Sequence, residues 1–475
     1  MKTNRILRTL KTLPAFLLFL AFLNQSLLAM NKKASEGGYK LPQYEKFTLG
    51  NGLTVYLMEQ HEVPLVYLSL ATPGGSIHDG EKAGLAFFTA EALHFGTKSY
   101  SKDQIEETFD FYGASFSSNA ANESARINAS FASKDRDKIL PVIKEMIVNP
   151  VFDKTEFEKR KQRALLELKQ AKESPRRVIK GYFDRFLYGN NPYGSPVAGT
   201  VTSVSTIVLE DLQNFYDKNY IPNGSAIALA GDFKAAEMKS YITSLFSDWK
   251  RKDIPSAETI TPEGKLNSSR ILLVNKDDAT ETTFLIGSYG IKQSNPDYVS
   301  VQVINTILGG RFTSWLNDEL RVNSGLTYGA RSDFSALKET GTFTISTYTG
   351  TATTVDAIDI ALKVLKRLHE KGIDEKTLTS AKNYLKGQFP PKYETAGALS
   401  QLLVNMFTYN FNESFINDFE KNVDSLTLDK AKEIIAKYFP ENNLQFVLIG
   451  KASEIKEKVA KYGQMTTVDI KDDSF

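Results

Sequence analysis

The chain contains no cysteine and only four histidines, His61, His78, His94 and His369, among its 475 residues. The absence of cysteine excludes a disulfide framework, a lipidated N-terminal cysteine and any chemistry that needs a thiolate. So few histidines also leave little material for a metal site built on imidazole ligands.

Neither sign of charge is in excess, because 58 lysines and arginines are balanced by 56 aspartates and glutamates for a net charge of +2. Both signs are spread along the chain, so nothing indicates the basic surface that binds nucleic acid. The length and the apolar share of 41% are typical of a globular protein with two or three domains. Partners must therefore be inferred from motifs.

Long apolar runs are missing except near the N-terminus. Four basic residues among the first eleven precede the apolar stretch Leu13–Ala29, and a polar segment follows it. This order predicts a secretory signal peptide at residues 1–29 and an exported mature chain, which we expect in the periplasm without a membrane span. The apolar stretch is shorter than the roughly 20 residues of a spanning helix. Leu27 nevertheless fits poorly at the small position before the cut, so a retained N-terminal anchor is the alternative.

Apolar periodicity alternates between strands and helices along the mature chain. Alternation around a Gly-Asn-Gly turn predicts a hairpin over residues 44–60. Further strand patterns cover residues 63–75 and 124–133, and helical patterns cover residues 82–95, 102–112, 135–147 and 154–171. Blocks of this kind favour an α+β fold in which sheets pack with helices.

Two segments of the chain share the order helix, proline-containing turn and buried strand. The marker residues are Asp211, Pro222 and Gly231 in one segment and Asp429, Pro440 and Gly450 in the other. Aspartate and proline are 11 residues apart in both segments, and proline and glycine are 9 and 10 apart. The match predicts a duplication, with two homologous mixed α/β sandwich lobes, each a mostly antiparallel sheet packed with helices.

The boundary between the lobes is expected in the polar, proline-containing segment Arg251–Arg270, which is typical of an exposed linker. We therefore expect the first lobe at residues 30–255 and the second at residues 256–475.

Four segments of the chain stand out: GLAFFTAEALHFGT (84–97), NPYGSPVAGT (191–200), YIPNGSAIALAGD (220–232) and LGGRFTSWLNDELRVNSGLTYGARSDF (308–334). Together they resemble the pitrilysin-like family, which includes insulin-degrading enzyme, the mitochondrial processing peptidase and shorter bacterial zinc peptidases. They follow the family's order over nearly the whole mature chain. The resemblance implies that the two lobes form one half of a clamshell.

The first of these segments departs from the family's zinc motif, H-x-x-E-H on a helix, in which two histidines bind zinc and the glutamate is the general base. In the resemblance, Phe87 stands at the first histidine, Ala90 at the glutamate and Glu91 at the second histidine. The third ligand falls on Glu167, 76 residues after Glu91. One ligand of three remains and the base is gone, so the resemblance implies no zinc on this chain and no peptidase activity by the chain alone.

An atypical metal site is one alternative for this helix. Glu91 and His94 are three residues apart and share a helix face, and such pairs bind metal when several converge. Glu167 would complete the set. The other interpretation is a core helix that ends in a solvated or hydrogen-bonded His94, with Glu167 an ordinary surface or paired carboxylate.

A second family motif is an arginine followed seven residues later by a tyrosine in a Gly-Leu-x-Tyr setting, and Arg321 and Tyr328 match it. In two-subunit bacterial members this pair reaches the zinc lobe of the other subunit. A guanidinium donates to substrate carbonyls or to a developing oxyanion, and a phenol donates to the same intermediate. The structural alternative is an arginine at a helix end and a half-buried tyrosine in a strand.

Family members hold peptides as an added strand, which uses backbone pairing and tolerates many sequences. The candidate edges are the segment around Asn119 and Ala120 in the first lobe and Gly341–Gly350 in the second. Both segments also fit ordinary half-buried strands.

The resemblance therefore implies a catalytically incomplete subunit of an exported two-subunit zinc peptidase. A homologous partner would carry the zinc, and this chain would contribute peptide binding together with Arg321 and Tyr328. The alternative from another class is a non-catalytic peptide-binding or scaffold protein. A third hypothesis is a peptidase with the atypical metal site, although no general base is evident.

Overall fold

The computed structural model describes residues 38–254 and 266–473. The predicted signal peptide and residues 255–265 of the predicted linker lie outside this range, so export, the alternative anchor and the lobe boundary stay predictions. Within the described residues, no helix combines the length and the apolar character that crossing a membrane requires.

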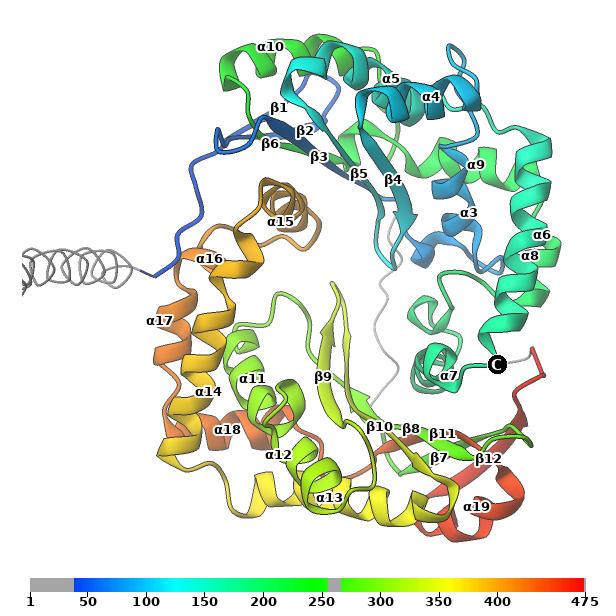
Figure 1. Ribbon diagram of the computed structural model, residues 1–475, viewed down its shortest axis with the longest axis vertical. Coiled ribbons are helices and arrows are strands. Elements are labelled where there is room, and N and C mark those ends of the chain that lie inside the picture. Colours follow the sequence, from blue (N-terminus) through cyan, green and yellow to red (C-terminus); the bar gives the residue numbers. More distant parts are fainter. Residues whose placement is uncertain (1–37, 255–265, 474–475) are drawn as a thin grey trace, which may run out of the picture.

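Two six-stranded sheets form the frame of the molecule (Figure 1). The first sheet has the order β1-β2-β6-β3-β5-β4. Its strands are β1 (Glu45–Thr48), β2 (Thr54–Glu59), β3 (Leu65–Thr72), β4 (Ser115–Ala120), β5 (Ala125–Ala132) and β6 (Ala226–Gly231). The second sheet has the order β12-β7-β11-β8-β10-β9. Its strands are β7 (Arg270–Asn275), β8 (Glu281–Tyr289), β9 (Arg331–Ala336), β10 (Gly341–Gly350), β11 (Gln445–Gly450) and β12 (Gln464–Asp469).

The strand order confirms the predicted duplication. The series β2-β6-β3-β5-β4 and β7-β11-β8-β10-β9 follow the same path, with a parallel first pair and three antiparallel pairs in each. The sheets differ at the remaining edge, where β1 runs antiparallel to β2 whereas β12 runs parallel to β7. Most pairs in each sheet are antiparallel, as the sequence predicts.

Helices cover both sheets. Those of the first half are α3 (Leu85–Ala92), α4 (Lys102–Tyr112), α5 (Arg136–Val148), α6 (Lys154–Ala171), α7 (Pro175–Tyr188), α8 (Val201–Thr206), α9 (Leu209–Asn219) and α10 (Ala235–Phe246). Those of the second half are α11 (Tyr298–Asn305), α12 (Trp315–Asn317), α13 (Thr354–Glu370), α14 (Glu375–Gln388), α15 (Ala396–Thr408), α16 (Ser414–Asn417), α17 (Phe419–Asp424), α18 (Leu428–Tyr438) and α19 (Ala452–Val459).

Short helical turns link these elements. The π-helical turns are η5 (Thr306–Gly310) and η6 (Asp318–Asn323), and the 3₁₀ turns are η1 (Ser76–His78), η2 (Ser133–Asp135), η3 (Pro192–Gly194), η4 (Pro222–Gly224), η7 (Thr351–Thr353), η8 (Pro390–Tyr393) and η9 (Ala460–Tyr462).

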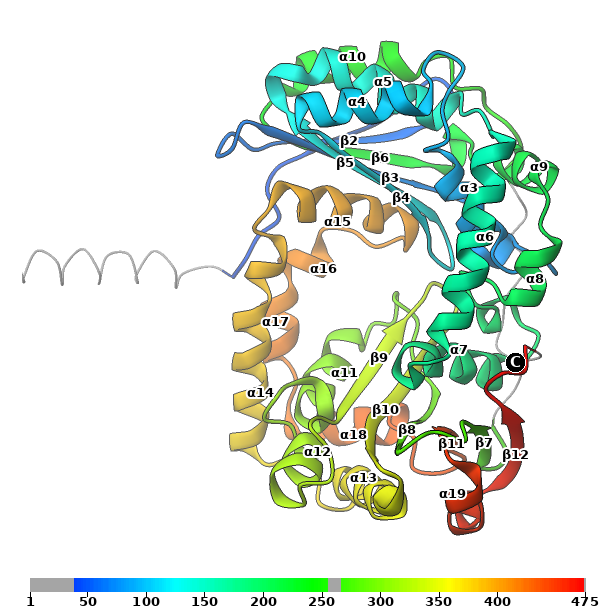
Figure 2. The same cartoon turned by 45° about the vertical axis from the view of Figure 1, so that its right-hand side comes forward.

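The two halves exchange one helix each (Figure 2). Helix α7 of the first half packs on β8 and β11 of the second sheet, and α15 of the second half packs on β3 and β6 of the first. The hydroxyl of Ser400 on α15 lies 2.9 Å from that of Ser69 on β3, and Tyr188 on α7 donates to the Gly341 carbonyl at 2.8 Å. Because each sheet needs a helix from the other half to bury one of its faces, the lobes are interlocked.

Small side chains allow the close approach of α15. The face of β6 that meets α15 presents only alanines, Ala226, Ala228 and Ala230, all fully buried. Gly397 of α15 lies against the Tyr67 ring, where an added Cβ would come within 3.0 Å of the ring. Dense packing of this kind tolerates little change in side-chain volume.

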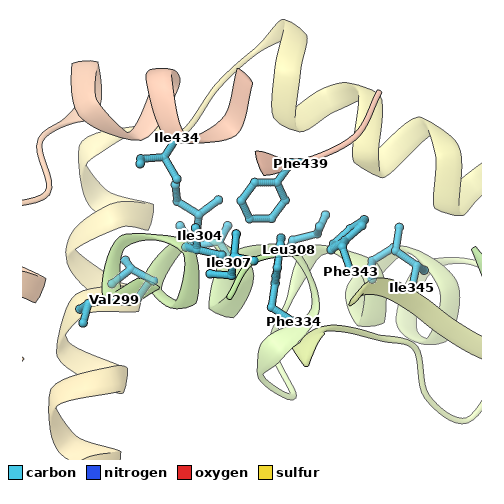
Figure 3. Packing of buried hydrophobic residues seen from close by; sticks show 14 of the residues in the cluster. Val299, Ile304, Ile307, Leu308, Phe334, Phe343, Ile345, Ile434 and Phe439 are labelled. Carbon is cyan, nitrogen blue, oxygen red and sulfur yellow. The ribbon is translucent and has the colours of Figure 1, made fainter. Parts of the chain in front are cut away.

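Aromatic rings occupy the centre of the second lobe (Figure 3). Phe334 on β9, Phe343 on β10 and Phe439 after α18 pack with ring centroids 4.9, 5.0 and 5.7 Å apart. Tilted and edge-to-face ring contacts add to the burial of apolar surface. They hold β9 against the body of the lobe although it lies at the edge of the sheet.

Local patterns in the sequence predict several elements closely. The hairpin over residues 44–60 is β1 and β2 in antiparallel register, and helices α4 and α6 coincide with the predicted ranges. Helix α3 is shorter than predicted at both ends, and its start is set by Gly84, whose φ of 100° is not helical.

Candidate functional site

Helix α3, at the zinc-motif segment, is fixed at its start by a buried carboxylate. The Asp79 side chain accepts from the backbone N–H groups of Gly84 at 2.9 Å and Ala86 at 2.7 Å. Burial raises the pKa of Asp79 to about 7, and the N–H donors oppose this shift. These bonds satisfy groups that a helix start otherwise leaves free.

The position at which the family has its general-base glutamate is occupied by the buried Ala90. Ala90 is fully buried, and its carbonyl accepts a hydrogen bond from the Ser118 hydroxyl on the neighbouring strand β4. The methyl group of Ala90 can neither take a proton nor polarise water.

A guanidinium lies among the three positions at which the family binds zinc. Arg160 of α6 forms a two-bond ion pair with Glu91, in which Nη2 lies 3.1 Å from Oε1 and Nε donates to Oε2. Its Nη1 lies 3.2 Å from the Glu167 carboxylate, and its Cζ lies 5.2 Å from the centre of the Phe87 ring. Arg160 thus contacts the residue at each of the three ligand positions.

This arrangement does not fit zinc. Burial raises the pKa of Glu91, and the ion pair with Arg160 offsets the rise only in part. The guanidinium already supplies the positive charge, and a metal ion at the same place would be repelled by it. Within residues 38–254 and 266–473, no three histidine or carboxylate side chains are grouped so that they could hold a metal ion. The structure therefore contradicts the alternative site of Glu91, His94 and Glu167.

His94 lies just after the end of α3. Its ring packs edge-to-face on Phe116 of β4, with the ring centroids 4.9 Å apart. Burial lowers the pKa of His94, and the charge of Lys102 lowers it further. His94 is half-buried, so its ring packs on Phe116 and keeps partial contact with solvent.

Arg160 is the site residue that sequence reasoning missed. The available signal was its spacing, because Arg160 and Glu167 lie seven residues, or about two helical turns, apart on one face of α6. No pattern in the sequence around Arg160 indicated that its guanidinium would form an ion pair with Glu91, which lies 69 residues earlier.

Restoring the H-x-x-E-H motif tests whether Arg160 prevents zinc binding at this position. We expect the variant Phe87→His, Ala90→Glu, Glu91→His to bind zinc at least about tenfold more weakly than the same variant with Arg160→Ala, because the guanidinium repels the ion. Zinc affinity would be measured by competition with a chromogenic chelator. Equal affinities would show that Arg160 moves away at no cost and does not occupy the metal position.

The second motif lies in a segment with unusual local structure. The sequence predicts a helix over Arg311–Leu320, whereas the structure has the short α12 followed by the π-helical η6. Arg321 lies in η6, and its Cζ is 4.6 Å from the centre of the Phe312 ring. Wide π-helical turns are frequent at functional sites.

Tyr328 lies in the loop between η6 and β9, with 82% of its surface exposed. This loop is held at both sides of the tyrosine, because Thr347 donates to the Gly329 carbonyl at 2.9 Å and Thr349 donates to the Leu326 carbonyl at 2.8 Å. Tyr328 is therefore not the half-buried strand residue that the structural alternative predicts. Among the described residues, no hydrogen bond joins Tyr328 to Arg321.

Two further apolar side chains of this segment are exposed, Phe312 at 69% and Val322 at 67%. With Arg321 and Tyr328 they make up what we term the exposed Arg/Tyr segment. Within it, the half-buried Arg321 contacts the exposed Phe312 ring, and such pairs of arginine and an aromatic ring are common at binding surfaces.

The first candidate strand edge is confirmed as an edge, because within residues 38–254 and 266–473 β4 pairs only with β5. Asn119 is exposed and lies opposite Arg126 in the register. Ala120 points to the other face and packs on the apolar core of the first lobe. The edge backbone can pair with a peptide, but of these two side chains Asn119 alone faces solvent.

The second candidate edge is wrong. Strand β10 (Gly341–Gly350) lies between β8 and β9 and pairs with both. The second sheet has β12 at one edge and β9 at the other, and β9 takes the place that β4 has in the first sheet. Alternation along β10 could not distinguish an inner strand from an edge strand, since both bury one face.

The sequence of the chain is similar to those of known peptidases and of a non-peptidase homologue. Residues 54–201 match the family model described as Insulinase (Peptidase family M16), and residues 206–385 match the model described as Peptidase M16 inactive domain. The chain is 26% identical to the non-peptidase homolog YmxG of Helicobacter pylori over 84% of this chain and 92% of that protein. It is 28% identical to an uncharacterized zinc protease of Rickettsia felis over 71% of this chain and 81% of that protein.

Solved structures share the fold. A peptidase M16 inactive domain from Pseudomonas fluorescens superposes with a TM-score of 0.81 at 25% identity, covering 86% of this chain and 98% of that one. A protease from Helicobacter pylori superposes with a TM-score of 0.79 at 20% identity, covering 86% of this chain and all of that one. The second likeness concerns the fold alone.

Proposed function

We propose that this chain, which belongs to peptidase family M16, is the zinc-free subunit of an exported two-subunit peptidase. The chain itself has a catalytically incomplete, peptidase-like fold. Its partner would be a homologous chain with an intact H-x-x-E-H motif. The two would close around a peptide, with the zinc chemistry on the partner.

The observation that carries this proposal is the solvent exposure of Tyr328. A tyrosine with 82% of its surface exposed, in a loop held by two threonine hydroxyls, contributes little to the stability of its own lobe. An exposed ring of this kind is suited to contact a second molecule. Arg321, stacked on the exposed Phe312, lies in the same segment.

The chemical roles follow from the side chains. The Arg321 guanidinium would donate to the substrate carbonyl or to the oxyanion that forms from it, and the Tyr328 hydroxyl would donate to the same intermediate. The backbone of the β4 edge would hold the substrate as an added strand, next to the exposed Asn119. Neither role requires a metal ligand from this chain, so the two halves of the chemistry can reside on different subunits.

The test is affinity capture of the tagged chain from the envelope fraction, followed by zinc analysis of the purified assembly. We expect a homologue of similar size with H-x-x-E-H in equal amount, and one zinc per pair that is lost when the partner's histidines are replaced. Recovery of the chain without such a homologue would contradict the proposal.

The second candidate is a non-catalytic peptide-binding or scaffold protein. It is favoured by the likeness to the Helicobacter pylori relative, which is named a non-peptidase homolog, and by the position of Arg160 among the three ligand positions. Peptide binding by the chain in the absence of any zinc-bearing partner, with no cleavage in the native envelope fraction, would support this candidate.

A further inference from the structure

One edge of the second sheet lies outside the duplicated unit. Strand β12 (Gln464–Asp469) runs parallel to β7 at this edge, where the first sheet has the antiparallel β1. Among the residues that the structure describes, β12 pairs with no strand except β7. The strand lies at the outer side of the molecule (Figure 2). We term its free side the β12 edge.

The open backbone groups of the β12 edge belong to two residues. Gln464 and Ile470 both donate to the β7 segment, at 3.2 and 2.9 Å. Because successive residues of a strand direct their backbone groups to opposite sides, Met465, Thr467 and Asp469 direct theirs away from β7. A residue of the following turn already donates to the Asp469 carbonyl at 3.0 Å and accepts from its N–H at 3.4 Å. Within the described chain, the N–H and C=O groups of Met465 and Thr467 thus have no strand partner.

The other three sheet edges are protected from pairing with another chain. Natural proteins protect free edges with charged side chains, with proline or with a covering helix. Strand β1 carries Glu45 and Lys46. Strand β9 carries Arg331 and Asp333, and helix α3 packs beside β4. Strand β12 has no charged residue and no proline over residues 464–468, so the β12 edge is the least protected of the four.

The centre of β12 is open on both faces of the sheet. Thr466 and Thr467 point to opposite faces, and both are exposed. The neighbouring Met465 and Val468 are half-buried and pack on the apolar cores at the two sides of the sheet. The strand is therefore fixed to its own lobe while its edge remains accessible.

Antiparallel pairing of β12 with its own copy satisfies the open groups. With a twofold axis at Thr466, Met465 of each copy lies opposite Thr467 of the other, and each of these pairs exchanges both N–H···O bonds. Thr466 then faces Thr466 of the second copy, and Gln464 faces Val468. No charged side chains are opposed, and cross-strand pairs of threonine stabilise a sheet.

Symmetry favours a second copy over a different strand as the occupant of this edge. Two identical edges that pair about a twofold axis use each other up, so the assembly is closed. Pairing of β12 with a different edge of a neighbour leaves one β12 edge free at every step and produces filaments. The closed pair also removes an edge that is open to uncontrolled association.

We infer that two copies of this chain associate through the β12 edge and form one continuous sheet across a twofold axis at Thr466. The inference does not rest on the proposed function, because β12 and β9 lie at opposite edges of the second sheet and the exposed Arg/Tyr segment precedes β9. An assembly with the zinc-bearing partner would then contain two copies of this chain.

The test measures association of the full mature chain, alone and with its captured partner, by sedimentation over a wide range of concentrations. We expect the unchanged chain to form a dimer whose fraction rises with concentration. Thr466→Lys and Thr466→Glu should each weaken the dimer by about tenfold or more, because like charges then face each other at the axis. Copies of the two variants that carry different affinity tags should pair with each other when mixed.

The matched control is Thr243→Lys, which adds the same charge to an exposed residue of α10 and should leave the dimer unchanged. Thr467→Pro tests the backbone separately, because proline removes an outward N–H, and it should also abolish the dimer. A chain that stays monomeric at every concentration, a dimer that persists in Thr466→Lys, or lysine and glutamate variants that fail to pair would overturn the inference. None of these outcomes affects the proposed function, which capture of the zinc-bearing partner decides.

Discussion

Replacing Arg321 by alanine, or Tyr328 by phenylalanine, is expected to lower turnover of the assembled peptidase by about 10²-fold or more. Each change removes a donor to charge that develops only in the transition state, so kcat should fall while KM changes little. The measurement is steady-state cleavage of a quenched fluorescent peptide by a reconstituted pair, with pair formation checked by size exclusion.

The controls separate this effect from a loss of assembly. Tyr384→Phe removes the hydroxyl of another exposed tyrosine, and Arg251→Ala removes an exposed arginine outside the segment. Both should retain turnover within about twofold, as surface changes usually do. Rates for Arg321→Ala and Tyr328→Phe at the level of the unchanged pair would remove the role proposed for these residues. Loss of pair formation instead of kcat would make them interface residues.

Replacing Arg160 by methionine should lower the free energy of unfolding by about 2 kcal/mol near neutral pH. The change leaves the Glu91 carboxylate partly buried without its charge partner and removes the guanidinium from the Phe87 ring. This loss is smaller than the roughly 3–5 kcal/mol for a fully buried ion pair, because Glu91 retains some contact with water. Urea unfolding would measure the difference.

The loss should depend on pH in a defined direction. Burial already raises the pKa of Glu91 above its ordinary value of 4.5, and without Arg160 it should rise further. A raised carboxyl pKa means that the folded state holds the proton more tightly, so stability decreases as pH rises from 4.5 toward the folded-state pKa. The deficit of Arg160→Met should therefore be small at about pH 4 and large at about pH 8.

Two matched variants test the cause. Lys169→Met changes an exposed cation of the same helix and should alter stability by less than about 0.5 kcal/mol. Glu167→Gln should also have a small effect, because half of the Glu167 side chain is exposed. A deficit of Arg160→Met that does not change between acid and neutral pH would show that Glu91 is not the group left unpaired.

Several features followed from the order of residues alone. The spacing of Asp211, Pro222 and Gly231, repeated in the second half, predicts the duplicated helix, turn and strand, because such a unit is built from contacts between neighbours in the chain. The helices α4 and α6 follow from apolar periodicity for the same reason. Phe87 and Ala90 already exclude a zinc ligand and a general base, since a missing functional group cannot be supplied by folding.

Other features arise from residues that are distant in the sequence. That Arg160 lies on Glu91, that α7 and α15 are exchanged between the sheets, and that β9 rather than β10 forms an edge all depend on how the elements pack. Periodicity reports which face of an element is buried, but not which partner buries it. The residue types by themselves determined that this chain lacks a zinc ligand at Phe87 and a general base at Ala90. Packing between distant segments determined that the Arg160 guanidinium lies among the three ligand positions.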